Sequence, residues 1–135
     1  MKLEIFTLCE AANDANGKLN LLGAFDHLWA RQTPVTHPHC AVAIRVRFSR
    51  IEEGNHRFKV TFADEDGKLV IPAIDATVGI RFANDDTTTA ANVILNINAL
   101  KLNTFGEYTV DVALDGRQEG SIPLYVQQMK EPADP

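Results

Sequence analysis

The chain has 135 residues and a formal net charge of −5, with 45% hydrophobic and 23% charged residues. This length predicts a single domain, and the composition is typical of a globular protein and excludes a disordered one. The acidic balance argues against nucleic acid as a partner, and no apolar run approaches the roughly 18 residues that a membrane span needs. Because the start of the sequence lacks the pattern of an export signal, we expect a cytoplasmic protein.

Charge is distributed unevenly along the chain. Residues 1–60 carry eight basic and six acidic side chains, whereas residues 61–135 carry five basic and twelve acidic ones. We therefore expect an anionic surface on the C-terminal half.

Short runs of alternating apolar and polar residues, closed by Gly, Asn or Asp, predict an all-β protein. The polar stretch 10–16 is interpreted as a loop, and within 90–102 an apolar helix is the rival interpretation. The predicted strands cover residues 3–8, 18–25, 27–32, 40–48, 57–62, 69–71, 74–82, 90–102, 108–114 and 122–126.

The number and spacing of these strands favour an antiparallel β-sandwich over a small closed barrel. Gly106 and Tyr108 form a Gly-x-Tyr motif that opens a strand, as a tyrosine corner does in immunoglobulin-like folds. We expect one domain over residues 1–127 with an immunoglobulin-like Greek-key arrangement, followed by a flexible tail at 128–135. Cys9 and Cys40 are expected to be buried free thiols.

The inward-facing residues of the alternating runs define the expected core. They are Phe6, Leu21, Phe25, Val42, Ile44, Val46, Phe58, Val60, Phe62, Val78, Ile80, Leu95, Tyr108, Val110, Val112 and Leu124.

Three segments resemble a known family. They are LCEAANDANGKLNLLGAFD at 8–26, EEGNHRFKVTFADEDGK at 52–68 and FGEYTVDVALDGRQEGSIPLYV at 105–126. Together they resemble an uncharacterised bacterial family of small all-β proteins. The resemblance implies a β-sandwich and a bacterial source, and it implies no catalytic residue.

Two sets of residues are weak candidates for holding a metal. His37 and His39 could approach one ion from an extended segment, with Cys40 pointing away, although a loop entering a strand explains them equally well. Loop carboxylates of a sandwich can bind calcium, but solvated turns account for the same acids. These carboxylates are Asp64, Asp66, Asp85 and Asp86.

Basic residues on two consecutive strands suggest a partner surface. If 40–48 and 57–62 formed a hairpin, Arg47 would face Arg57 and Arg45 would face Lys59, which is destabilising. The strands could instead lie in different sheets, acids could interleave, or an anionic partner could bind. Trp29 is interpreted as core more readily than as a partner anchor.

No nucleophile elbow, phosphate loop or paired catalytic carboxylates are recognisable, so we do not expect an enzyme or a cofactor. The leading hypothesis is a non-catalytic interaction or assembly module that binds another protein or itself through a sheet face or edge strand. The alternative is a domain that binds a small ligand or calcium through its loop carboxylates.

Overall fold

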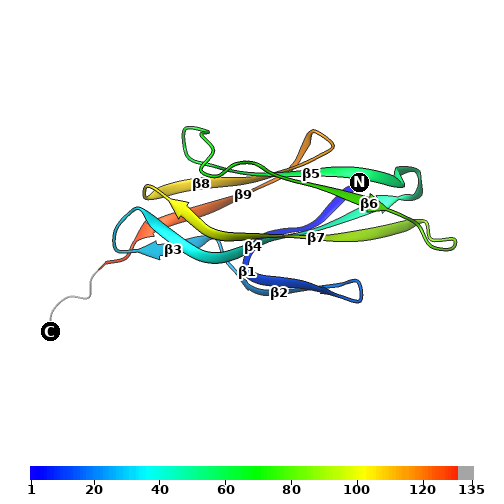
Figure 1. Ribbon diagram of the computed structural model, residues 1–135, viewed down its shortest axis with the longest axis horizontal. Coiled ribbons are helices and arrows are strands. Elements are labelled where there is room, and N and C mark those ends of the chain that lie inside the picture. The colour runs from blue at the N-terminus through cyan, green and yellow to red at the C-terminus, as the bar shows by residue number, and fades with distance from the viewer. Residues whose placement is uncertain (131–135) are drawn as a thin grey trace.

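A computed structural model describes residues 1–130 and shows two packed β-sheets (Figure 1). The only helical element in this part of the chain is a single 3-10 turn, η1, at Arg50–Glu52. The strands are β1 (Lys2–Ala15), β2 (Lys18–Ala24), β3 (His27–Ala30), β4 (Val35–Ser49), β5 (Gly54–Ala63), β6 (Ile74–Ile80), β7 (Thr88–Leu102), β8 (Gly106–Leu114) and β9 (Arg117–Gln128).

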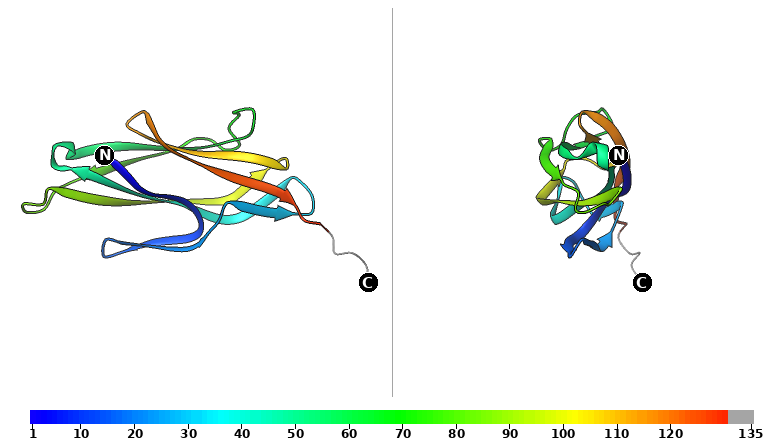
Figure 2. Two further views of the ribbon diagram at one scale, coloured as in Figure 1. Left: turned by 180° about the vertical axis from the view of Figure 1, so that it is seen from behind. Right: turned by 90° about the vertical axis from the view of Figure 1, so that its right-hand side faces the viewer.

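The four-stranded sheet has the order β2-β1-β4-β7, and the five-stranded sheet has the order β3-β9-β8-β5-β6. An end-on view shows β6 and β7 along one side of the sandwich and β1 and β9 along the other (Figure 2). This arrangement confirms the all-β sandwich. The expectation of purely antiparallel pairing is wrong at one place, because β3 runs parallel to β9.

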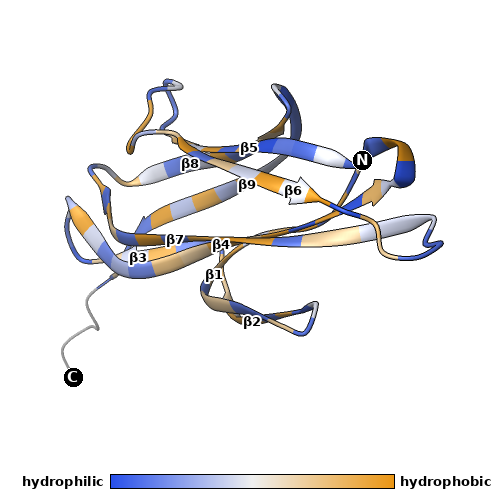
Figure 3. Cartoon of the chain, turned by 45° about the vertical axis from the view of Figure 1, so that its right-hand side comes forward, coloured by the Kyte–Doolittle hydropathy of each residue, from blue (hydrophilic) through white to orange (hydrophobic). Residues whose placement is uncertain are grey.

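The core lies between the two sheets because apolar side chains alternate along each strand. Polar and apolar segments alternate visibly on β5, β8 and β9 (Figure 3). The largest side chains with almost no exposed surface are Phe48, Phe58, Phe62, Leu8, Ile44, Leu100, Leu102, Leu114, Leu124, Val42, Val46 and Val60.

Leu21 was expected in this core, but it is 38% exposed. The reason is that β2 pairs with only the second half of β1 and takes no place between the sheets. Four further predicted core residues are partly buried and pack against the core edge. They are Phe6, Phe25, Val78 and Leu95.

The loop predicted at residues 10–16 is wrong, because β1 continues to Ala15 and forms a hairpin with β2. The hairpin closes at Asn16 and Gly17, whose φ angles of 54° and 78° are those of an Asn-Gly hairpin turn. Its tip contacts the outer face of β7, where the Asn92 side-chain amide donates to the Gly17 carbonyl oxygen at 3.2 Å. The hairpin therefore folds over part of the outer face of β4 and β7.

A small second cluster lies under this hairpin. Cys9, Ala41 and Ala43 have no exposed surface and pack against Leu19 and Ile94. Cys9 and Cys40 are both buried free thiols, as the sequence predicts. Burial raises the pKa of the Cys40 thiol to about 11, so this thiol stays protonated at neutral pH.

Other local expectations differ in outcome. Residues 90–102 form a strand, whereas 69–71 contribute only an isolated bridge between Leu69 and Ala63. Tyr108 is buried and its hydroxyl donates a 2.7 Å hydrogen bond to the carbonyl oxygen of Thr104, the contact that a tyrosine corner requires.

The last strand, β9, ends at Gln128. Residues 131–135 of the predicted tail lie outside the described residues. In the described part of the chain, no helix has the length and apolarity needed to cross a bilayer.

Candidate functional site

The four basic residues predicted as a partner surface lie on two opposite faces. Strand β4 belongs to the four-stranded sheet and β5 to the five-stranded sheet, so the hypothetical hairpin between them does not form. Arg45 and Arg47 occupy the outer face of β4 and both donate to the carboxylate of Glu4, at 3.1 and 2.8 Å. The hydrogen bond from Arg47 is the main reason that the pKa of Glu4 lies below its usual value.

Arg57 and Lys59 lie on the outer face of β5. Lys59 is directly opposite Asp75 on β6, so an acid does interleave with the basic residues. The backbone N–H of Arg57 donates to the carboxylate of Asp115, at 2.8 Å. A hollow of about 480 Å³ on this face is lined by Arg57, Lys59, Asp75 and Asp115.

The predicted calcium ligands are not brought together. Asp64 and Asp66 lie in the β5–β6 loop and Asp85 and Asp86 in the β6–β7 loop, at opposite ends of the sandwich (Figure 1). The Asp64 carboxylate accepts hydrogen bonds from the backbone N–H groups of Asp66 and Lys68, as a solvated turn does. Among residues 1–130, no three potential ligands from Asp, Glu, His and Cys form a cluster that could hold a metal.

The histidine pair is also engaged elsewhere. His37 and His39 both lie on the outer face of β4, as an extended segment requires, and Cys40 points into the core. The ring of His37 contacts the Glu10 carboxylate at 3.2 Å, and that of His39 contacts the Asn98 side-chain oxygen at 3.0 Å. The two rings thus bind neighbouring side chains separately.

Trp29 lies on the surface, and its interpretation as core is wrong. Its exposed fraction is 57%, while its neighbours Leu28 and Ala30 point inward. The ring stacks on His27 with centroids 6.0 Å apart, and His27 in turn contacts Tyr125 with centroids 4.9 Å apart. We call His27, Trp29 and Tyr125 the aromatic patch.

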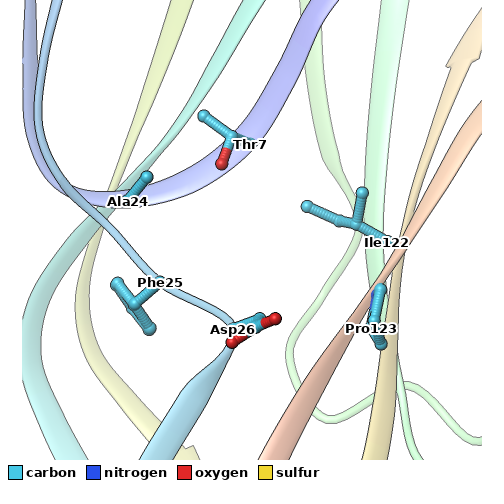
Figure 4. A pocket seen from close by; sticks show the side chains of 6 residues that line it. All are labelled: Thr7, Ala24, Phe25, Asp26, Ile122 and Pro123. Atoms are coloured by element: carbon cyan, nitrogen blue, oxygen red, sulfur yellow. The ribbon is translucent and has the colours of Figure 1, made fainter.

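A groove adjoins the aromatic patch where the two sheets separate (Figure 4). It measures about 330 Å³. We call it the β1–β9 groove. It is lined by Thr7, Ala24, Phe25, Asp26, Ile122 and Pro123. Asp26 joins the groove to the aromatic patch, because its carboxylate contacts the His27 ring at 2.5 Å.

The groove forms because the segment between β2 and β3 crosses from one sheet to the other. The Phe25 N–H donates to the Leu8 carbonyl oxygen on β1, and the Tyr125 N–H donates to the Asp26 carbonyl oxygen, at 2.9 and 2.7 Å. Pro123 stands on β9 where that strand faces the groove, and it has no N–H to offer an incoming strand. The groove is therefore suited to side chains more than to strand pairing.

The lining residues offer a mixed binding surface. Phe25 and Ile122 also pack against the core and supply apolar contact area. Thr7 supplies a hydroxyl and Asp26 a carboxylate, and Figure 4 shows both among the lining side chains. Asp26 is the single ionisable residue among the six lining residues, and its carboxylate also contacts the His27 ring.

The comparisons place the chain in a family. Residues 4–127 match the family of unknown function DUF6941. The chain belongs to this family. This match confirms the resemblance to an uncharacterised family of small all-β proteins. The matched segment includes the aromatic patch and the β1–β9 groove. No curated protein matches the sequence.

The sequence analysis identified Trp29 but missed its companions His27 and Tyr125. His27 could have been found, since an i, i+2 spacing on a strand puts two side chains on one face. Tyr125 could not, because its contact depends on the parallel pairing of β3 with β9 over a separation of about a hundred residues.

Proposed function

We propose that this protein is a non-catalytic interaction module that binds a partner protein through the aromatic patch and the β1–β9 groove. The observation that carries the proposal is the exposure of Trp29, the single tryptophan of the chain, on a hydrogen-bonded strand. An exposed tryptophan close to a half-buried tyrosine and a groove is typical of interface hot spots, because aromatic side chains bury a large area with little loss of conformational freedom.

The neighbourhood of Trp29 supports a protein partner of mixed chemistry. An apolar side chain of the partner can enter the groove over Phe25 and Ile122, while the exposed carboxylate of Asp26 favours a hydrogen-bond donor or a cation. Leu22 and Ile51 are even more exposed, at 72% and 93%, but neither belongs to an aromatic cluster.

The finer features of the proposal rest on further observations. An immunoglobulin-like Greek key is supported by the strand order β1-β4-β7 against β9-β8-β5 and by the corner formed by Tyr108 and Thr104. A cytoplasmic location is supported by two free thiols, which suit a reducing compartment.

The proposal is tested by capturing partners from the native host with the full chain, with Trp29→Ala, and with Ile51→Ala as a matched control. Ile51 is an exposed apolar residue on η1, at the end of the sandwich away from β3. We expect Trp29→Ala to lose a specific partner that the wild type and Ile51→Ala both retain. Because Trp29 is the single tryptophan of the chain, binding of the purified partner is expected to shift the tryptophan emission of this protein to the blue. Equal capture by Trp29→Ala would refute the proposal.

A further inference from the structure

We infer that the free edge of β7 pairs antiparallel with β7 of a second copy of this chain. This edge lies on the side of the sandwich away from β9 and the aromatic patch, so the inference is independent of the partner proposed for Trp29 (Figure 2). The inference concerns the backbone of β7 alone.

β7 is an unusually long edge strand. It runs for 15 residues, or about 50 Å at the usual rise per residue, and pairs with β4 over this length. It is last in its sheet, and in the described part of the chain no backbone hydrogen bond joins its outer edge to another segment. The outer edge therefore presents a row of N–H and C=O groups that can pair with another strand.

The other edges are short or protected. β3 has four residues, and β6 has seven and carries Asp75. β9 has Pro123 where it faces β1, and β2 carries Lys18 and a left-handed Gly23 with φ of 67°. Charged residues, proline and irregular backbone are the devices by which proteins keep edge strands from pairing.

β7 has none of these devices along most of its length. Between Thr88 and Leu100 it contains no charged residue, no proline and no glycine, in a chain with a net charge of −5. Its first irregularity is Ala99, which has a φ of 57°, so residues 88–98 form a regular edge. The absence of protection along this edge is the main evidence for pairing.

The chemistry of the edge favours a second copy as the occupant. Two-fold antiparallel pairing sets residues 88–98 of one copy against the same residues of the other, so charged side chains of one sign would be brought close together, and this segment has none. Centred on Leu95, for example, such pairing puts Val93 opposite Ile97 and keeps their apolar side chains on the core side. The outcome is one continuous sheet of eight strands across two copies.

The test measures the mass of the full chain in solution by sedimentation or light scattering over a concentration series. The wild type is expected to rise from 14.9 kDa toward twice that mass. Asn96→Lys is the disrupting variant, because Asn96 is exposed and its side chain makes no hydrogen bond within residues 1–130. The new like charges are expected to weaken the dimer by at least about tenfold.

Thr77→Lys is the matched control. Thr77 is an exposed residue on β6, the neighbouring edge on the same side of the sandwich, so the added charge is the same but lies on the other sheet. We expect Thr77→Lys to dimerise like the wild type. If Asn96→Lys dimerises as tightly as the wild type, the inference is wrong.

Hydrogen exchange of the wild type gives a second measurement that needs no variant. Backbone amides in residues 88–98 are expected to exchange more slowly at high than at low protein concentration, whereas amides in β6 are unchanged. A chain that stays at 14.9 kDa up to millimolar concentration overturns the inference, as does a dimer with unchanged exchange in β7. Trp29→Ala is expected to dimerise normally, so loss of the partner and loss of self-pairing are distinguishable.

Discussion

Asn92 on β7 donates a 3.1 Å hydrogen bond from its side-chain amide to the carboxylate of Asp14, 78 residues earlier in the chain. This contact ties the tip of the β1–β2 hairpin to the four-stranded sheet. The hairpin in turn covers Cys9, whose thiol donates to the Ala41 carbonyl oxygen at 3.5 Å. The hairpin thus covers a small apolar cluster.

Asn92→Ala is expected to loosen this cover. The variant loses the hydrogen bonds to Asp14 and Gly17, worth about 1–2 kcal/mol together, and also the acceptor of a 2.9 Å hydrogen bond from Arg45. Cys9 should therefore react with a thiol reagent on the order of tenfold faster. The labelled cysteine is identified by mass spectrometry. Asn96→Ala, on the same strand, is the control and should label like the wild type, and unchanged labelling of Cys9 in Asn92→Ala would show that the hairpin is held by other contacts.

Tyr108→Phe is expected to lower the free energy of unfolding by about 1–2 kcal/mol. The substitution removes a hydroxyl that bonds Thr104 and leaves its carbonyl oxygen without that donor. Urea unfolding measures the loss. The matched control is Tyr125→Phe, because the Tyr125 hydroxyl makes no hydrogen bond within the described residues, and an equal loss in both variants would argue against a structural role for the corner.

The ion pair between His56 and Asp115, at 2.6 Å, predicts a pH-dependent stability. Burial lowers the pKa of His56, but hydrogen bonds to Asp115 and to the Glu52 carbonyl oxygen outweigh burial and raise it overall. A raised pKa means that protonated His56 stabilises the fold below its ordinary value of 6.5, and that this stabilisation is lost as pH rises through the folded-state pKa.

His56→Gln should therefore cost more unfolding free energy at about pH 5.5 than at about pH 9, as measured by denaturant titration at both values. The pKa of Asp115 is lowered, chiefly by its hydrogen bond to His56, so its own contribution persists until the pH falls below its usual range. Asp115→Asn is expected to flatten the dependence near neutral pH. A His56→Gln cost that is the same at both pH values would contradict the assignment.

Gly120→Ala is expected to destabilise the protein by about 1–3 kcal/mol through overpacking. A Cβ atom at Gly120 would lie 2.7 Å from Leu3 Cδ2 and 3.1 Å from Phe6 Cδ2, where β1 packs against β9. Thermal or denaturant unfolding measures the effect. Gly79→Ala is the control, because its Cβ would meet only the flexible side chains of Asn55 and Arg81, and an equal loss in both variants would exclude overpacking as the cause.

Much of the fold could be predicted from local pattern. The alternation of Val42, Ile44 and Val46 predicts a strand with one buried face, and all three are fully buried. The tyrosine corner predicted at Tyr108 is also local, since a Gly-x-Tyr at a strand start positions the hydroxyl near the preceding turn. The hairpin at Asn16 and Gly17 was also predictable from its Asn-Gly turn, but the polar residues before it suggested a loop.

The candidate site was much less predictable. Trp29 is a large apolar residue of the kind usually found in a core, and its exposure depends on where β3 pairs. The basic residues of β4 and β5 stand on consecutive strands but lie on opposite faces of the sandwich, because the chain crosses from one sheet to the other between these strands. Short-range spacing carries no information about such a crossing.

The sequence by itself determined which residues of a strand share a face, because side-chain direction alternates with every residue of extended chain. The tertiary structure alone decided which sheet each strand joined, how the β1–β2 hairpin folded over Cys9, and that Trp29 reached the surface beside Tyr125. These features depend on backbone pairing between segments far apart in the chain, and backbone hydrogen bonds are the same for every sequence. Only the packing of the whole chain selects among the possible pairings.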